Sequence, residues 1–176
     1  MREIYIVLTK TQTMLSRAIR LATKYKYNHT SLALDIGLEP MYSFGRLRPH
    51  NPFIGRFVEE SIHRGFFKSF PMTCCLVLEL SVDDETYVKL QTLIIGFKSK
   101  QKDYKYNIRG LFLAGVKIDM KYRKNKFYCT QFVKHVLNEA GVDISILPEC
   151  VTPNDFNQIE GVKTVYEGLL KEYSIK

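Results

Sequence analysis

The sequence predicts an α+β domain in which an antiparallel sheet packs against helices. Segments with the two-residue apolar period of strands occur beside segments with the apolar period of helices. The chain has 176 residues, of which 45% are hydrophobic and 25% charged, and these are the size and composition of one globular unit. No repeat, low-complexity tract or linker divides it. We therefore expect a single domain over residues 1–176.

The predicted strands include one with a histidine at its start. In the segment YNHTSLALD, Leu32 and Leu34 alternate with small or polar residues, so one face of the strand is apolar and the other is small. By the same alternation, His29 is expected on the face that carries the small residues. A turn after this strand and an apolar return predict a hairpin. The expected strands are residues 3–9, 29–35, 41–44 and 73–82.

Helices are predicted from capping residues and helical periodicity. The expected helices are residues 13–25, a helix opened by Asp83 or Asp84 and continuing to Phe97, 127–141, one that begins at Pro153 after Thr152, and 164–173. Residues 45–71 carry three glycines and three prolines, which predicts a long ordered loop with at most one short strand. Residues 108–118 are apolar and fit either a helix or a strand.

The helix FYCTQFVKHVLNEAG, residues 127–141, contains a cysteine in its first turn. Cys129 shares the apolar stripe of the helix with Phe132 and Val133, so one interpretation is a buried core cysteine. The other is a nucleophile, because unpaired N–H groups and the helix dipole at this end favour a thiolate. The dipole is worth only about 0.3 to 1 kcal/mol, so a reactive thiol needs a cationic partner. The basic residues of the segment 117–126 are solvated candidates, and their charge is screened.

Histidine is the partner that chemistry favours, since it can hold a thiolate and then protonate a leaving group. His135 lies six residues after Cys129 on the same helix and faces away from it. His50 and His63 fall in the predicted loop. His29 is the best candidate, because its small neighbours leave room for a helix terminus, although a strand histidine can equally be a hydrogen-bonded structural residue.

Composition restricts the other function classes. The formal net charge of +8 would attract anionic partners weakly, including a membrane surface, and no RNA-binding pattern supports specific nucleic-acid recognition. No secretory or membrane-spanning segment is recognisable, so we expect a cytoplasmic protein. The four cysteines show no CxxC spacing and the histidines form no ligand-spaced cluster with them, so we expect reduced thiols and neither a metal nor another cofactor.

The order of YNHTSLALD, MYSFGR, FVEE, FYCTQFVKHVL and VTPNDF resembles the permuted papain-like branch of the NlpC/P60 cysteine peptidase superfamily, the YiiX-like proteins. Lecithin:retinol acyltransferase-like enzymes are more distant relatives of that branch. The resemblance spans Glu3 to Phe156, with the histidine before the cysteine, the reverse of the unpermuted order. It implies a papain-like fold in which the cysteine helix packs on a small antiparallel sheet, with Cys129 as nucleophile and His29 as general base.

These families orient the imidazole with a polar residue on the strand after the histidine, where this chain reads MYSF. Ser43 is therefore the candidate orienting residue. Its hydroxyl would stabilise an imidazolium less than a carboxylate does, and the register of the hairpin decides whether it faces His29. Glu59 or Glu60 of FVEE could substitute from the predicted loop, unless they are a solvated acid pair.

The resemblance implies a cysteine amidase or peptidase that acts on a small peptide, an amino-acid amide or another acyl substrate. Two other classes stay open. A lipid-directed acyltransferase or thioesterase would use the same nucleophile, and the basic surface and the phenylalanines at 53, 57, 66 and 67 support it. A non-catalytic binding module would keep the fold without a strong third residue. The sequence does not indicate an oligomeric state.

Overall fold

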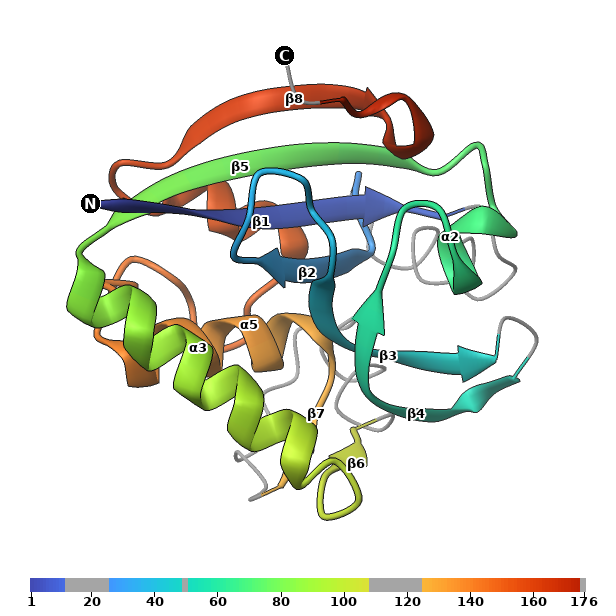
Figure 1. Cartoon of the computed structure of the whole chain (residues 1–176), viewed down its shortest axis with the longest axis horizontal. Coiled ribbons are helices and arrows are strands. Elements are labelled where there is room, and N and C mark those ends of the chain that lie inside the picture. The colour runs from blue at the N-terminus through green and yellow to red at the C-terminus, as the bar shows by residue number, and fades with distance from the viewer. Residues whose placement is uncertain (12–25, 49–50, 108–124, 175–176) are drawn as a thin grey trace.

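A six-stranded antiparallel sheet forms the centre of the computed structural model, which describes residues 1–11, 26–48, 51–107 and 125–174 (Figure 1). The strand order is β4-β3-β2-β1-β5-β8, so β4 and β8 are the edges. The strands are β1 (Arg2–Lys10), β2 (His29–Ala33), β3 (Met41–Arg48), β4 (Asn51–Glu60), β5 (Cys74–Val82) and β8 (Lys163–Leu169). A separate parallel pair joins β6 (Lys105–Tyr106) to β7 (Lys126–Phe127).

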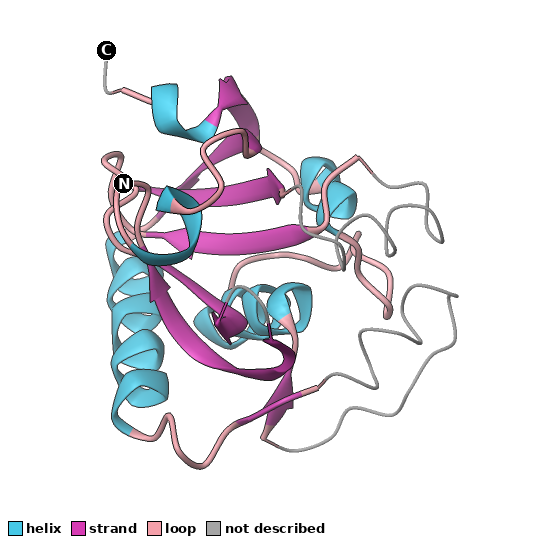
Figure 2. Cartoon of the chain, turned by 90° about the vertical axis from the view of Figure 1, so that its right-hand side faces the viewer, coloured by secondary structure: helices cyan, strands magenta, loops and turns pink. Residues whose placement is uncertain are grey.

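Two longer helices pack together beside the sheet. They are α3 (Asp84–Ser99) and α5 (Cys129–Ala140), and α5 also contacts β2 and β3. Figure 2 shows α3 running along one side of the molecule, with α5 next to the curved strands. The short helix α2 (Gly65–Lys68) and the 3-10 helices η1 (Pro153–Gln158) and η2 (Leu170–Glu172) complete the described elements.

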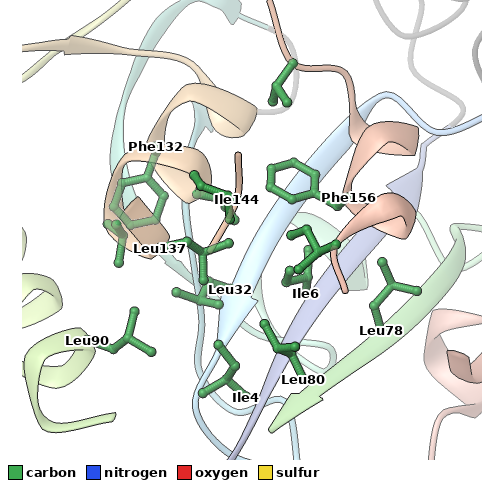
Figure 3. Close-up of a cluster of buried hydrophobic side chains, with 14 of the residues drawn as sticks. Ile4, Ile6, Leu32, Leu78, Leu80, Leu90, Phe132, Leu137, Ile144 and Phe156 are labelled. Atoms are coloured by element: carbon green, nitrogen blue, oxygen red, sulfur yellow. The ribbon is translucent and has the colours of Figure 1, made fainter. Parts of the chain in front are cut away.

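The sheet buries side chains on both faces, as strand alternation requires. On the helix side, alternate residues of β1, β2 and β5 pack against α3, α5 and η1 (Figure 3). On the opposite side a second cluster packs against α2 and η2. The first cluster includes Ile4, Ile6, Leu32, Leu78, Leu90, Phe132, Leu137 and Phe156, and the second includes Tyr5, Val7, Ala33, Cys75, Val77, Phe67 and Leu170.

The structure confirms the α+β class and the antiparallel sheet. The predicted strands correspond to β1, β2, β3 and β5, and the hairpin pairs Leu32 with Tyr42. The cap of α3 is Asp83, whose carboxylate accepts the backbone N–H of Thr86 at 2.6 Å. Gly141 ends α5 with a left-handed φ of 93°, as glycine does after many helices. Thr152 precedes a helix as expected, but that helix is the 3-10 helix η1.

The predicted loop over residues 45–71 is wrong. Most of it is the end of β3 and the ten residues of β4, which pair antiparallel. A Cβ at Gly55 would lie 2.7 Å from Cγ of Tyr106 and 2.8 Å from the carbonyl oxygen of Gly45, so this glycine marks a close approach inside the sheet. Pro52 is tolerated because β4 is an edge strand, where an N–H can be missing.

The predicted helix over residues 164–173 is also wrong. This segment forms β8, which pairs with the outer edge of β5, and then the short helix η2. Pairing with β8 satisfies the backbone hydrogen-bonding groups along the otherwise open edge of β5. This tertiary pairing outweighs the weak helical pattern of the segment. The predicted helix 13–25, the segment 108–118 and most of the basic segment 117–126 lie outside the described residues. None of the described helices is long and apolar enough to cross a membrane.

Candidate active site

Cys129 is the first residue of α5 and its side chain is buried. The helix begins here because Tyr128 is extended, with φ −115° and ψ 174°, while its carbonyl already accepts the N–H of Phe132 at 3.0 Å. The sulfur therefore lies at the helix end where backbone N–H groups have no helical carbonyl to bond. The structure thus places Cys129 in the first turn of the helix, as the sequence predicts.

The start of α5 is held by a side chain from its own first turn. Oε1 of Gln131 accepts the N–H of Tyr128 at 3.4 Å and Nδ2 of Asn107 at 3.1 Å. Asn107 is fixed in turn, because its backbone N–H donates to the carbonyl of Phe127 at 2.8 Å beside the β6–β7 pair. A second tie comes from Thr130, whose hydroxyl donates to the carbonyl of Val151 at 2.9 Å.

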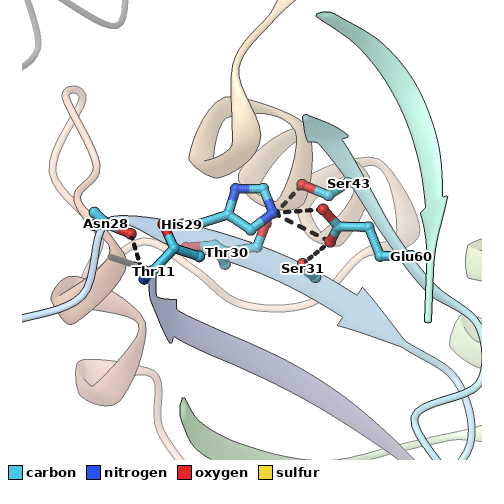
Figure 4. A network of polar contacts seen from close by, with 7 residues as sticks. All are labelled: Thr11, Asn28, His29, Thr30, Ser31, Ser43 and Glu60. Atoms are coloured by element: carbon cyan, nitrogen blue, oxygen red, sulfur yellow. Dashed lines mark hydrogen bonds and ion pairs between the residues drawn. The ribbon is translucent and has the colours of Figure 1, made fainter. Parts of the chain in front are cut away.

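His29 is the first residue of β2, and its imidazole bonds a carboxylate. Nε2 lies 2.9 Å from Oε1 and 3.1 Å from Oε2 of Glu60, which is the last residue of β4 (Figure 4). Ser31 donates its hydroxyl to Oε2 of the same carboxylate at 2.5 Å. The side chains of His29 and Glu60 are only 17% and 9% exposed, so water screens this pair weakly.

The thiol of Cys129 is the second partner of the imidazole. Burial by itself lowers the pKa of His29, but the Glu60 carboxylate and a hydrogen bond with Cys129 outweigh it and raise the pKa to about 10. Because Nε2 faces Glu60, Nδ1 is the ring nitrogen left for the sulfur. At neutral pH the imidazole is therefore protonated, and it lies between a carboxylate and a sulfur.

Glu60 reaches His29 across the intervening strand β3. A Cβ on Gly45 of β3 would lie 3.1 Å from Cγ2 of Val58, 3.2 Å from Oε1 of Glu60 and 3.6 Å from Cε1 of His29. Any larger residue at position 45 would press on the Glu60 carboxylate and come into contact with the imidazole. The absence of a side chain here therefore leaves the space in which the carboxylate and the imidazole meet.

Ser43 does not take the orienting position predicted from MYSF. Its buried hydroxyl donates to the backbone carbonyl of Thr30 at 2.9 Å, whereas the carboxylate of Glu60 contacts the imidazole. The physical reason is that two carboxylate oxygens bind Nε2 more strongly than one hydroxyl, and Glu60 is long enough to cross β3. Glu60 is thus the third residue of the arrangement, and Ser43 is a small neighbour on the strand that it crosses.

The signal for Glu60 is present in the sequence but depends on recognising β4. In FVEE, Phe57 belongs to the core on the helix side and Glu59 pairs with Lys98 of α3 at 2.8 Å. Alternation therefore puts Val58 and Glu60 on the other face. If this segment is read as a loop, no alternation is expected. The sequence alone therefore does not show which of Glu59 and Glu60 faces His29.

The other histidines and thiols occupy different surroundings. His135 packs against Phe97 and Phe127, with ring centroids 5.9 Å and 5.2 Å away, and burial lowers its pKa. His63 is exposed, and His50 lies outside the described residues. All four cysteines are free, and burial raises the pKa of Cys75 to about 12. Cys129 is the cysteine whose sulfur bonds His29.

The chain matches no protein-family model, and no curated protein matches its sequence. The case for a function therefore depends on the geometry of the site.

Proposed function

We propose that this chain is a cysteine-dependent hydrolase with a circularly permuted papain-like fold, acting on an amide bond of a small peptide or an amino-acid conjugate. The observation that carries the proposal is the sequence of contacts from the thiol of Cys129 through His29 to the carboxylate of Glu60. A nucleophile, a base and a group that orients the base are the minimum set for this chemistry. The α+β class and the helix packed on an antiparallel sheet agree with such a fold.

The reaction follows from these three side chains. The thiolate of Cys129 attacks the carbonyl carbon of the substrate, and the N–H groups at the start of α5 stabilise the resulting oxyanion. His29 gives its proton to the departing amine as the C–N bond breaks, which leaves a thioester on the sulfur. The now neutral imidazole takes a proton from water, the hydroxide attacks the thioester, and the thiolate departs with the acid as product.

Glu60 acts on His29 rather than on the substrate. Its carboxylate fixes the ring by two contacts to Nε2 and stabilises the imidazolium that the resting pair contains. Ser31 holds the carboxylate by a hydrogen bond, and Gly45 leaves the space that the carboxylate occupies. They are positioning residues in this mechanism.

The two rival function classes lose part of their support. Phe57 and Phe67 are each only 3% exposed and Phe66 is half-buried, so these rings offer little apolar surface to a lipid, while the side chain of Phe53 lies outside the described residues. The lack of a strong third residue in MYSF favours the non-catalytic binding module. Glu60 supplies a carboxylate at that point.

The test is to trap the acyl-enzyme. The purified chain is mixed with activated acyl-amino-acid esters and amides, quenched in acid and analysed by peptide mass spectrometry. We expect an acyl adduct on Cys129 that hydroxylamine removes, together with turnover that is lost in Cys129→Ala and in His29→Ala. Absence of any adduct and of turnover with amides, esters and thioesters alike would exclude the hydrolase.

A further inference from the structure

A cavity of about 580 Å³ lies between α2, the end of β4 and the residues that precede β3. Its volume is in the range of about 300 to 1,000 Å³ that small-molecule sites occupy. Among the described residues that line it are Glu39, Glu60 and Arg64, but neither Cys129 nor His29. Glu60 therefore borders the cavity while its carboxylate holds the imidazole.

The cavity contains charges of both signs that do not neutralise each other. Arg64 forms no ion pair with an acid in the part of the chain that the structure describes. Glu39 uses Oε1 to accept the hydroxyl of Ser61 at 2.9 Å and the N–H of Ile62 at 2.7 Å, which leaves Oε2 for a ligand. A third lining acid, Glu59, is already paired with Lys98.

The remaining wall is apolar, from Pro40, Val58 and Phe66 among others. A ligand that matches this lining carries a cation for the carboxylates, an anion for the guanidinium and an apolar body between or beside them. Charge-assisted hydrogen bonds to Arg64, which is exposed, and to Glu39, which is half-buried, would select a ligand that carries both charges.

From these features we infer that the cavity binds a zwitterionic apolar amino acid, either free or as a short peptide. Its ammonium group contacts Glu39 and the outer side of Glu60, its carboxylate contacts Arg64, and its side chain packs on Phe66 and Val58. An ammonium beside Glu60 repels the imidazolium of His29, so the ligand weakens the pairing of His29 with Cys129. The binding itself does not depend on the proposed hydrolase activity.

The experiment is isothermal titration calorimetry of the full chain with L-leucine, N-acetyl-L-leucine and L-leucinamide. We expect leucine to bind and each blocked analogue to bind about tenfold more weakly or worse, because each lacks one charge-assisted contact. Arg64→Gln should weaken leucine about tenfold without changing leucinamide, and Glu39→Gln should weaken leucine without changing N-acetyl-leucine. Lys68→Gln, an exposed charge on α2 outside the cavity lining, is the matched control and should bind leucine normally.

Two further arms complete the test. Leucyl-leucine distinguishes a free amino acid from a peptide as the preferred ligand, since both carry the required charges. Cys129→Ala should still bind leucine, because the sulfur is not part of the cavity lining, and this separates the site from the hydrolase. The inference is overturned if the folded wild type binds none of these ligands, if all bind equally, or if Arg64→Gln leaves leucine binding unchanged.

Discussion

Two adjacent glutamates at the end of β4 have different surroundings and therefore different consequences when they are changed. Glu60 is nearly buried and bonds His29 and Ser31, whereas Glu59 lies on the other face and pairs with the exposed Lys98. The pair of Glu60 with His29 is shielded from water, so this carboxylate stabilises the charged imidazole strongly. The pair of Glu59 with Lys98 is open to water and contributes little. The chain thus provides its own matched control for the role of the carboxylate.

Glu60→Gln keeps the size of the side chain but removes its charge. We expect the pKa of His29 to fall, because the Glu60 carboxylate is the main group that raises it. Hydrolysis should fall on the order of 100-fold, and iodoacetamide labelling of Cys129 at neutral pH should slow. Glu59→Gln should change both rates by less than about twofold, since exposed ion pairs contribute little. Equal effects of the two substitutions would remove Glu60 from the mechanism.

Gly45→Ala tests the space in which the carboxylate and the imidazole meet. The new methyl would press on Val58 and Glu60 at 3.1 Å and 3.2 Å, so we expect a loss of about 1 to 3 kcal/mol in the free energy of unfolding and slower labelling of Cys129. Gly96→Ala in α3 is the control, because a Cβ there meets nothing within 4 Å. That change should stabilise the chain by about 0.5 to 1 kcal/mol and leave the labelling rate unchanged. Urea unfolding and mass spectrometry measure the two quantities.

At the scale of elements, β2, β4 and α5 bring together residues that are far apart in the chain. β2 supplies His29, β4 supplies Glu60 across β3, and the first turn of α5 supplies the sulfur. The position of that turn depends on Gln131, which bonds both the backbone of Tyr128 and the side chain of Asn107. A shift of the helix start would move the sulfur relative to the imidazole even if the core were intact.

Gln131→Ala should therefore lower the reactivity of Cys129 without unfolding the protein. We expect a stability loss of about 1 to 2 kcal/mol from the two hydrogen bonds and a clear decrease in the labelling rate. Gln131→Glu keeps an acceptor oxygen for both donors and should restore most of the rate. If the alanine variant labels like the wild type, the first turn is fixed by other contacts, such as that of Thr130 with Val151.

The elements that the sequence predicts correctly are those determined by local pattern. β1, β5 and α3 have clear apolar periods, and the hydrogen bond between Cys129 and His29 is the contact that thiol chemistry leads us to expect. β4 is missed because its glycine and proline are read as loop signals, although Gly55 is required by contact with Tyr106. β8 is missed because the free edge of β5, a tertiary feature, decides its structure. Glu60 is left unresolved because its contact crosses a whole strand.

At the scale of the whole molecule, the imidazole couples folding to pH. The pKa of His29 rises from an ordinary value of 6.5 to about 10 on folding, so the bound proton stabilises the folded state. This contribution is complete below about pH 6.5 and decreases as the pH rises toward 10. We expect the free energy of unfolding, measured in urea from pH 6 to 10, to fall more steeply for the wild type than for His29→Gln. Parallel curves would contradict an imidazolium in the folded protein.

The pairing of Cys129 with His29 is the central claim, and the pH dependence of iodoacetamide labelling at each cysteine tests it most directly. The measurement uses peptide mass spectrometry on the wild type and on His29→Ala, with the buried Cys75, whose pKa burial raises to about 12, as an internal reference. We predict that Cys129 labels faster than the other three cysteines at about pH 6, where ordinary thiols scarcely react, and that this advantage disappears in the variant. A Cys129 that is unreactive, or equally reactive without His29, would mean that α5 carries a core cysteine and that the site is not a cysteine hydrolase.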